Sequence, residues 1–190
     1  MNLIVLPWLP DSPGRKTKVP KRRFEPPEVN VAAMDQRTIF TWGYRKQTQD
    51  TLLAIMKARR GLLVDVRFMP FGRSKFAQYR LKASLGDRYL WAEGYGNRNW
   101  QKDSMADILL ADSEHAFRLI VWYLSTSAVG LNPILMCVEP RGIECHRLDA
   151  ARHLAAQTGW PIINLSQDGR VDSGTETSRS SAPCSPSPYR

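Results

Sequence analysis

Residues 38–66 constrain the fold most, because their pattern predicts a strand, a helix and a second strand in succession. Residues 38–42 (TIFTW) are rich in β-branched and aromatic side chains, which favours a short strand. Thr48 is a candidate helix N-cap, and Gly61 follows basic residues that suit a helix C-terminus. Residues 62–66 (LLVDV) are mostly apolar without alternation, as in strands covered on both faces. Two strands joined by a helix in this way are expected to run parallel.

The later part of the chain continues this alternation of strands and helices to residue 166. We therefore predict an α/β fold, namely a single three-layer domain with a mostly parallel sheet over residues 38–166. The later elements expected are a strand at 89–92, a helix capped by Ser113 and Glu114, a strand at 133–137, a helix from His146 to Gly159 and a strand at 161–165.

Both ends of the chain fall outside this domain by composition. Residues 1–37 form an apolar start and a basic, proline-rich arm, and residues 167–190 form a tail rich in Ser and Pro. Such segments bury too little apolar surface to order themselves, so we expect both to be disordered. No apolar run reaches the roughly 18 residues of a membrane span, and the first ten residues are a poor secretion signal. With 3 cysteines, too few for a disulfide framework, this favours a cytoplasmic protein without a membrane partner.

The formal charge of +9 is unevenly distributed along the chain. Residues 45–102 contain 13 Lys and Arg against 4 Asp and Glu, whereas residues 103–168 contain 4 against 8. This asymmetry favours an anionic partner, nucleic acid or a nucleotide, for the first half of the domain. The alternative is that the charge serves only solubility.

Residues 134–147 (ILMCVEPRGIECHR) concentrate the side chains that most often carry chemistry. Cys137 is expected at the carboxyl end of a strand, and Cys145, His146 and Arg147 at the start of the next helix. In parallel sheets that edge is where ligands bind, because helix N-termini converge there with free N–H groups.

Several motifs resemble the bacterial and phage family catalogued as domain of unknown function 488. They are residues 41–44 (TWGY), 65–67 (DVR) with Pro70 and Ser74, 94–97 (GYGN), 137–139 (CVE) and 145–147 (CHR). The most specific part is C-x-E followed by C-H-R, and the resemblance covers about residues 38–166. It implies a compact α/β domain with these residues clustered at one end, and no agreed activity. Trp42 and Arg45 depart from the pattern, which predicts a wider and more cationic first loop.

Cys137 is a candidate nucleophile, because a thiolate facing a helix N-terminus beside His146 and Arg147 is stabilised there. His146 would act as its base or as an acid, and Glu139 would orient the imidazole. The alternative is that Cys137 is an ordinary core cysteine, a common fate of free thiols. The candidate catalytic residues are Cys137, Glu139, Cys145, His146, Arg147 and Asp65.

A metal site is the competing hypothesis for the same residues. Cys137, Cys145 and His146, with Glu139 or Asp65, supply the right ligand types for zinc. Ligands adjacent at 145 and 146 are awkward, however, and no C-x2-C pair is present. The prediction is therefore no metal and no cofactor.

Asp65 and Arg147 are expected to organise the site. Asp65, at the end of the second strand, is either a carboxylate base, the partner that fixes Arg147, or part of a buried ion pair. If the strand continues, Arg67 is expected on the face opposite to Asp65. Arg147 is expected to be an anchor that pairs with Asp65 or Glu139, or else waits for an anion.

Basic and aromatic residues alternate over residues 67–82, a composition that suits phosphates and stacked bases, although its aromatic side chains could equally cover the core. The function predicted first is an enzyme acting on a phosphate-bearing substrate, a nucleotide or nucleic acid. The alternative is a non-enzymatic nucleic-acid-binding accessory protein in which the Cys and His residues form a structural clasp. The predicted substrate-binding residues are Tyr44, Arg67, Arg73, Lys75 and Asn97.

Overall fold

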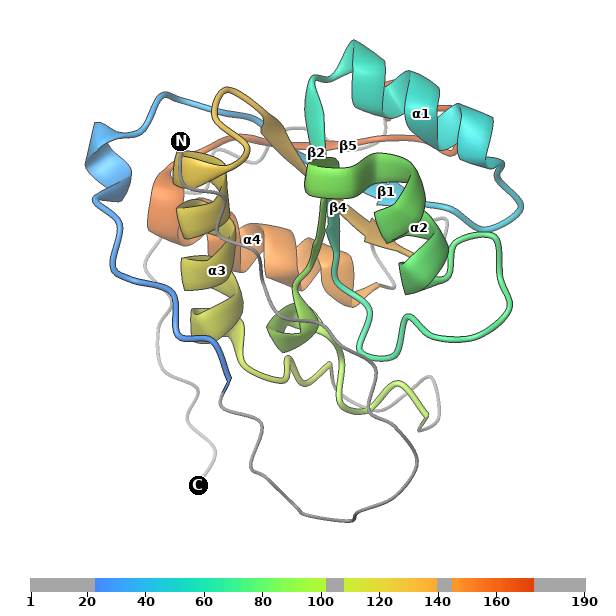
Figure 1. Cartoon of the computed structure of the whole chain (residues 1–190), viewed down its shortest axis with the longest axis horizontal. Coiled ribbons are helices and arrows are strands. Elements are labelled where there is room, and N and C mark those ends of the chain that lie inside the picture. The colour runs from blue at the N-terminus through green and yellow to red at the C-terminus, as the bar shows by residue number, and fades with distance from the viewer. Residues whose placement is uncertain (1–22, 102–107, 140–144, 173–190) are drawn as a thin grey trace.

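A five-stranded, all-parallel sheet forms the centre of the protein (Figure 1). The computed structural model describes residues 23–101, 108–139 and 145–172. The strand order is β3-β2-β4-β1-β5. The strands are β1 (Ile39–Gly43), β2 (Gly61–Asp65), β3 (Tyr89–Trp91), β4 (Asn132–Cys137) and β5 (Ile162–Asn164). The predicted α/β class and parallel sheet are confirmed.

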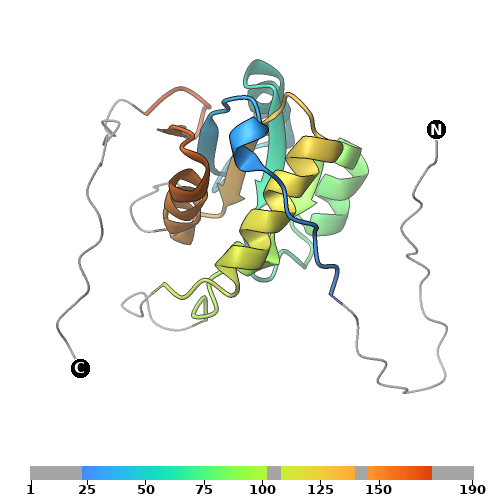
Figure 2. The same cartoon turned by 90° about the vertical axis from the view of Figure 1, so that its left-hand side faces the viewer.

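Helices cover both faces of the sheet and make the three predicted layers (Figures 1 and 2). On one face α1 and α2 pack on side chains such as Trp42 and Leu63, and on the other α3 and α4 pack on side chains such as Val64 and Leu135. The helices are α1 (Gln49–Ala58), α2 (Gln78–Leu85), α3 (Ser113–Thr126) and α4 (His146–Thr158), with 3-10 turns at Val31–Ala33, Gly86–Arg88 and Glu93–Tyr95. Among the described residues, none of the helices combines the length and apolar character needed to cross a membrane.

Most helix ends follow the predicted local chemistry. The Thr48 hydroxyl accepts a hydrogen bond from the main-chain N–H of Thr51 at 3.1 Å and caps α1. Gly159 ends α4 with a left-handed φ of 72°, a conformation that suits glycine. The predicted cap of α3 was wrong by one residue. Asp112, rather than Ser113, receives the capping hydrogen bond, from the N–H of His115.

Helix α2 has no counterpart among the predicted elements, because its residues were assigned only to the basic and aromatic segment. It is short, its N-cap residue Ala77 supplies no side-chain cap, and among its described side chains it buries only Leu81. A single buried apolar residue produces no helical periodicity of hydrophobic positions in the sequence. Tertiary contact therefore determines this helix, with Leu81 packed against the same core as Trp42.

The ordered domain is longer at both ends than predicted. Residues 23–37, assigned to the arm, lie along α3, where the Phe24 ring packs on Trp122 at 4.9 Å between centroids. Arg37 is buried and donates hydrogen bonds to the carbonyls of Leu124 and Leu131. The rest of the predicted arm, residues 1–22, lies outside the described residues.

At the other end, residues 167–172 were assigned to the tail but pack on the domain. The Trp42 indole donates to the carbonyl of Gln167 at 3.1 Å, and Val171 forms an antiparallel bridge with Leu165. Residues 173–190 lie outside the described residues.

The position of β4 between β2 and β1 creates the setting of the site. Cys137 at its end is level with Gly43, and Met136 is level with Asp65. The chain turns to α4 on one face after β4, but to α1 and α2 on the opposite face after β1 and β2. Loops that leave neighbouring strands toward opposite faces open the crevice where α/β proteins bind ligands.

Candidate functional site

Four side chains meet at the end of β4, and we call them the Cys–His cluster: Cys137, Glu139, Cys145 and His146. Glu139 Oε2 lies 2.9 Å from Cys137 Sγ and 3.0 Å from Cys145 Sγ. His146 Nδ1 lies 3.9 Å from each sulfur. One ligand atom from each residue falls within 4.8 Å of all the others. Both cysteines are free thiols, each only 2% exposed.

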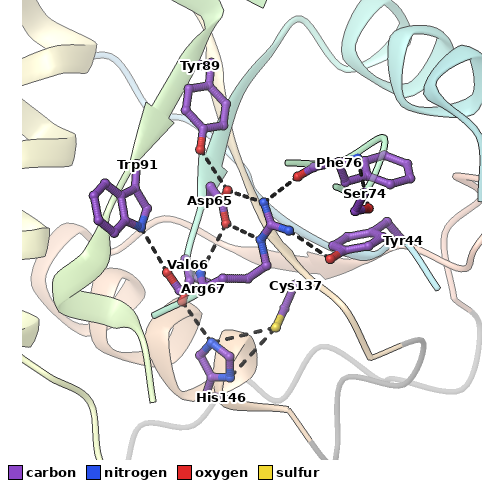
Figure 3. Close-up of polar contacts among 10 residues, drawn as sticks. All are labelled: Tyr44, Asp65, Val66, Arg67, Ser74, Phe76, Tyr89, Trp91, Cys137 and His146. Atoms are coloured by element: carbon purple, nitrogen blue, oxygen red, sulfur yellow. Dashed lines mark hydrogen bonds and ion pairs between the residues drawn. The ribbon is translucent and has the colours of Figure 1, made fainter. Parts of the chain in front are cut away.

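The tautomer of His146 follows from its main-chain contact. Its Nε2 lies 2.9 Å from the carbonyl oxygen of Val66, the residue that follows β2 (Figure 3). A carbonyl can only accept, so Nε2 carries the proton in the neutral ring. Nδ1 then carries the lone pair, and it lies 3.9 Å from each sulfur, while Nε2 also lies 3.7 Å from Cys137 Sγ.

Burial and the thiols set the protonation of the cluster. Burial acts to raise the pKa of Glu139, but hydrogen bonds from the Cys137 and Cys145 thiols outweigh it, so that this pKa is lowered. The hydrogen bond with Cys137, together with burial, raises the pKa of Cys145 far above its ordinary value. Burial acts to lower the pKa of His146, but its contacts with Cys145 and the Val66 carbonyl raise it overall. A carboxylate that receives two thiol hydrogen bonds therefore lies at the centre.

Arg147 contacts one of its two predicted partners, Glu139, but through the main-chain carbonyl and not the carboxylate. Its side chain is 1% exposed, and Nη1 donates to the main-chain carbonyl of Glu139. The alternative in which Asp65 fixes Arg147 is not the one that the structure adopts, because Asp65 pairs with Arg67. Arg147 is thus a buried residue that holds the main chain next to Cys137.

Asp65 and Arg67 form a second group, the Asp–Arg network, with Tyr44, Phe76 and Tyr89 (Figure 3). Arg67 donates two hydrogen bonds to the Asp65 carboxylate, from Nε at 2.7 Å and from Nη2 at 2.5 Å. The Tyr89 hydroxyl donates to the same carboxylate at 2.8 Å. Arg67 also donates to the Tyr44 hydroxyl and to the Phe76 carbonyl, both at 2.8 Å. Of the alternatives for Asp65, the geometry matches the buried ion pair.

The expectation that Asp65 and Arg67 lie on opposite faces was wrong. Residues two apart in an extended chain project to the same side, so the pair closes locally. Burial acts to lower the pKa of Arg67, but the hydrogen bond and attraction to Asp65 outweigh it and raise this pKa. Burial and the Asp65 carboxylate together raise the pKa of Tyr89 well above its ordinary value. Burial likewise raises the pKa of Tyr44, against the opposing effect of Arg67.

Of the other predicted binding residues, only Lys75 approaches either group, with its ammonium 5.9 Å from the centroid of the Phe76 ring. Arg73 and Lys75 are exposed in the loop before α2. Asn97 is half-buried, and its side-chain oxygen accepts the N–H groups of Asn99 and Leu109, both at 3.0 Å. Asn97 therefore closes a turn, and its role in binding stays a prediction.

Comparison with known proteins gave no relative. No family model, no curated protein and no solved structure matches the chain.

Sequence reasoning missed the groups that join the two parts of the site. Tyr89 was seen only as a strand residue, and no pattern marks the main-chain carbonyls of Val66 and Phe76. Val66 lies between Asp65 and Arg67, and its carbonyl meets His146. The end of β2 thus contacts the Cys–His cluster through its main chain and forms the Asp–Arg network through its side chains.

Proposed function

We propose that this chain is a non-enzymatic nucleic-acid-binding protein and that its Cys–His cluster is a structural clasp. The observation that carries this is the placement of charge on the surface. Because α1 and α2 pack on the same face of the sheet, the basic first half of the domain covers that side (Figure 1). Over residues 44–88 the exposed cations are Arg45, Lys46, Lys57, Arg60, Arg73, Lys75, Arg80 and Lys82, and the exposed acids are Asp50 and Asp87.

The start of α1 and the length of α2 border one groove on this basic face. It is lined by Gln49, Tyr79 and Arg80 together with two small residues of α2. The Tyr79 ring is 59% exposed, and the Arg80 guanidinium lies 5.5 Å from its centroid. An exposed aromatic ring beside a cation suits a base stacked next to its phosphate. The Gln49 amide also donates a hydrogen bond to the carbonyl of Lys75 at 2.7 Å, which connects the loop before α2, with Arg73 and Lys75, to α1.

The cluster itself offers little to a phosphate group. Its thiols are buried and donate to the Glu139 carboxylate, whose negative charge repels an anion. The nearby guanidinium of Arg67 is occupied by Asp65, Tyr44 and Phe76. Phosphate contacts are therefore assigned to the exposed cations of the α1 and α2 face, which fix position without reading sequence.

Binding of labelled DNA and RNA, single-stranded and duplex, to the full chain tests the proposal when followed over a range of salt. Affinity should fall steeply with salt, because neutralised phosphates release counterions. Changing Arg73, Lys75 and Arg80 together to Gln should weaken binding and reduce the salt slope by about 1 for each phosphate that is no longer neutralised. Arg152→Gln, an exposed cation on α4, is the matched control and should leave both unchanged. Absence of binding to every one of these nucleic acids at low salt would refute the proposal.

A second candidate is an enzyme acting on a phosphate-bearing substrate through Cys137, Glu139, His146 and Arg147. The observation that favours it is the 3.9 Å separation of His146 Nδ1 from Cys137 Sγ, close enough for this nitrogen to take the thiol proton after a small movement. Turnover of a panel of nucleotides and oligonucleotides should then vanish in Cys137→Ser with His146→Ala, while the fold persists. Equal turnover by this variant and the original protein would exclude the enzyme.

Membership of the domain of unknown function 488 family is likewise a proposal. It rests on the motifs alone, and it is supported by the position of 65–67, 137–139 and 145–147 around one edge of the sheet. A cytoplasmic location is proposed on the same terms, from the free thiols of Cys137 and Cys145.

A further inference from the structure

We propose that the Cys–His cluster binds one zinc ion, with Cys137 Sγ, Cys145 Sγ, His146 Nδ1 and a Glu139 carboxylate oxygen as ligands. Two thiolates, an imidazole and a carboxylate are a ligand set that zinc accepts, and thiolates select it over magnesium or calcium. This inference goes beyond nucleic-acid binding and stands independently of it.

The separations in the cluster approach those of a tetrahedral site. Zinc–sulfur bonds of about 2.3 Å and zinc–nitrogen bonds of about 2.0 Å imply ligand atoms about 3.5 to 3.8 Å apart. The two sulfurs lie 3.9 Å from His146 Nδ1, and 2.9 and 3.0 Å from Glu139 Oε2. The carboxylate has to move outward by roughly half an ångström as the thiol protons leave. The His146 ring, whose Nε2 also lies 3.7 Å from Cys137 Sγ, has to rotate slightly to direct Nδ1 at the ion.

Main-chain contacts support each part of this ligand set. The Val66 carbonyl fixes the proton on His146 Nε2 and leaves Nδ1 for the metal, as backbone carbonyls commonly do for metal-ligating histidines. The Arg147 guanidinium holds the carbonyl of Glu139. The N–H of Tyr44 donates to the carbonyl of Cys137 at 3.1 Å.

Electrostatics also favours a cation at this point. Two thiols and a carboxylate are all groups that become anions, and they converge in a buried site. A divalent ion stabilises all three at once, whereas an added phosphate would increase the repulsion. With four protein ligands and buried thiols the site is of the closed, structural type.

The adjacency of Cys145 and His146, which argued against a metal in the sequence, is resolved by the backbone. Cys145 has an extended conformation, with φ −133° and ψ 130°, whereas His146 is the first residue of α4. The change from extended chain to helix brings both side chains to the same side, which neither a continuous helix nor a continuous strand allows. The prediction of no metal rested on this adjacency and on the absence of a C-x2-C pair.

Metal content of the full chain, purified without chelator and desalted after incubation with zinc, tests the proposal directly. We expect one zinc ion per chain, and at least a tenfold lower content in Cys145→Ser and in His146→Ala. His153→Ala is a matched control on the same helix, since its imidazole contacts the Tyr95 hydroxyl instead, and should retain the metal. Cys184→Ser, outside the described residues, should also retain it.

Cobalt binding by the unaltered protein tests the site even if the variants fail to fold. Cobalt should give a thiolate charge-transfer band and the intense visible bands of tetrahedral coordination, and added zinc should abolish both. Folded protein that holds far less than one zinc per chain and gives no thiolate band with cobalt would overturn the proposal. Nucleic-acid binding can fail while zinc is retained, and zinc can be absent while nucleic acid binds, so the two proposals are separable.

Discussion

The Asp–Arg network and the Cys–His cluster both enclose a carboxylate near the carboxyl edge of the sheet, but they satisfy it differently. Asp65 is fully buried and is met by the guanidinium of Arg67 and the hydroxyl of Tyr89. Glu139 is met by two thiols, which are weak donors that can themselves become anions.

This difference indicates what each group is for. In the Asp–Arg network, a bidentate guanidinium and further protein donors satisfy the hydrogen-bonding capacity of the carboxylate. The network therefore needs no external ligand, and it holds the end of β2 in place. Thiols around a carboxylate have the composition of a metal site, completed by an external cation. Removal of a protein side chain from the Asp–Arg network should therefore lower the stability of the fold. For the Cys–His cluster, removal of the bound ion should do so.

The largest expected effect is that of Asp65→Ala. It leaves the Arg67 guanidinium buried without its partner, which should lower the free energy of unfolding by about 3 to 5 kcal/mol. Urea denaturation would measure this, with Asp149→Ala on the exposed ion pair to Arg152 as control, expected to cost under about 1 kcal/mol. Equal losses in the two variants would contradict the view that the network is a closed structural unit.

Chelation should come next in size and should act on the cluster alone. If free zinc is about a hundredfold above its Kd, its removal should cost about 2.7 kcal/mol of stability. Thermal unfolding with and without chelator would measure the loss, and Cys145→Ser should be insensitive to chelator. A chelator effect of the same size in that variant would place the metal elsewhere.

Tyr89→Phe sharpens the comparison by removing one donor while keeping the ring. Loss of a hydrogen bond to a buried carboxylate should cost about 1.5 to 3 kcal/mol. Tyr123→Phe is the matched control, because its exposed hydroxyl donates only to the Asp87 carbonyl, and should cost about 0.5 kcal/mol. Denaturation midpoints that coincide for the two variants would show that the Tyr89 hydroxyl adds nothing.

Alkaline pH should give the smallest of these effects. Burial, followed by the Asp65 carboxylate, raises the pKa of Tyr89, so the folded protein keeps a proton that the unfolded chain releases above about pH 10. The stability associated with this proton is complete below about pH 10 and declines as pH rises, by about 1.4 kcal/mol per unit for each such tyrosine. Denaturation between about pH 9 and 11 should show a shallower decline in Tyr89→Phe, and parallel curves would contradict this.

Local sequence signals predicted much of the fold. Thr48 and Gly159 mark helix ends, and the unbroken apolar run at 62–64 indicates a strand that is buried on both faces and therefore parallel to its neighbours. Gly61 was expected to stop the first helix, but α1 ends at Ala58, Arg60 takes the left-handed φ of 48°, and Gly61 begins β2. The convergence of Cys137, Cys145 and His146 was also predictable, because a strand end and the next helix start are close in the chain. Helix α2 was not predictable, since Leu81 alone makes no periodic pattern.

By itself, therefore, the sequence determined the α/β class, the parallel strands and the edge where the chemistry gathers, because hydrophobic periodicity and helix-end residues act over a few residues. Only the tertiary structure decided which groups pair there. Arg67 rather than Arg147 takes Asp65, and the Val66 carbonyl selects the proton position on His146. Such choices depend on strand order and on main-chain atoms brought together from 80 residues apart, and no local pattern carries that information.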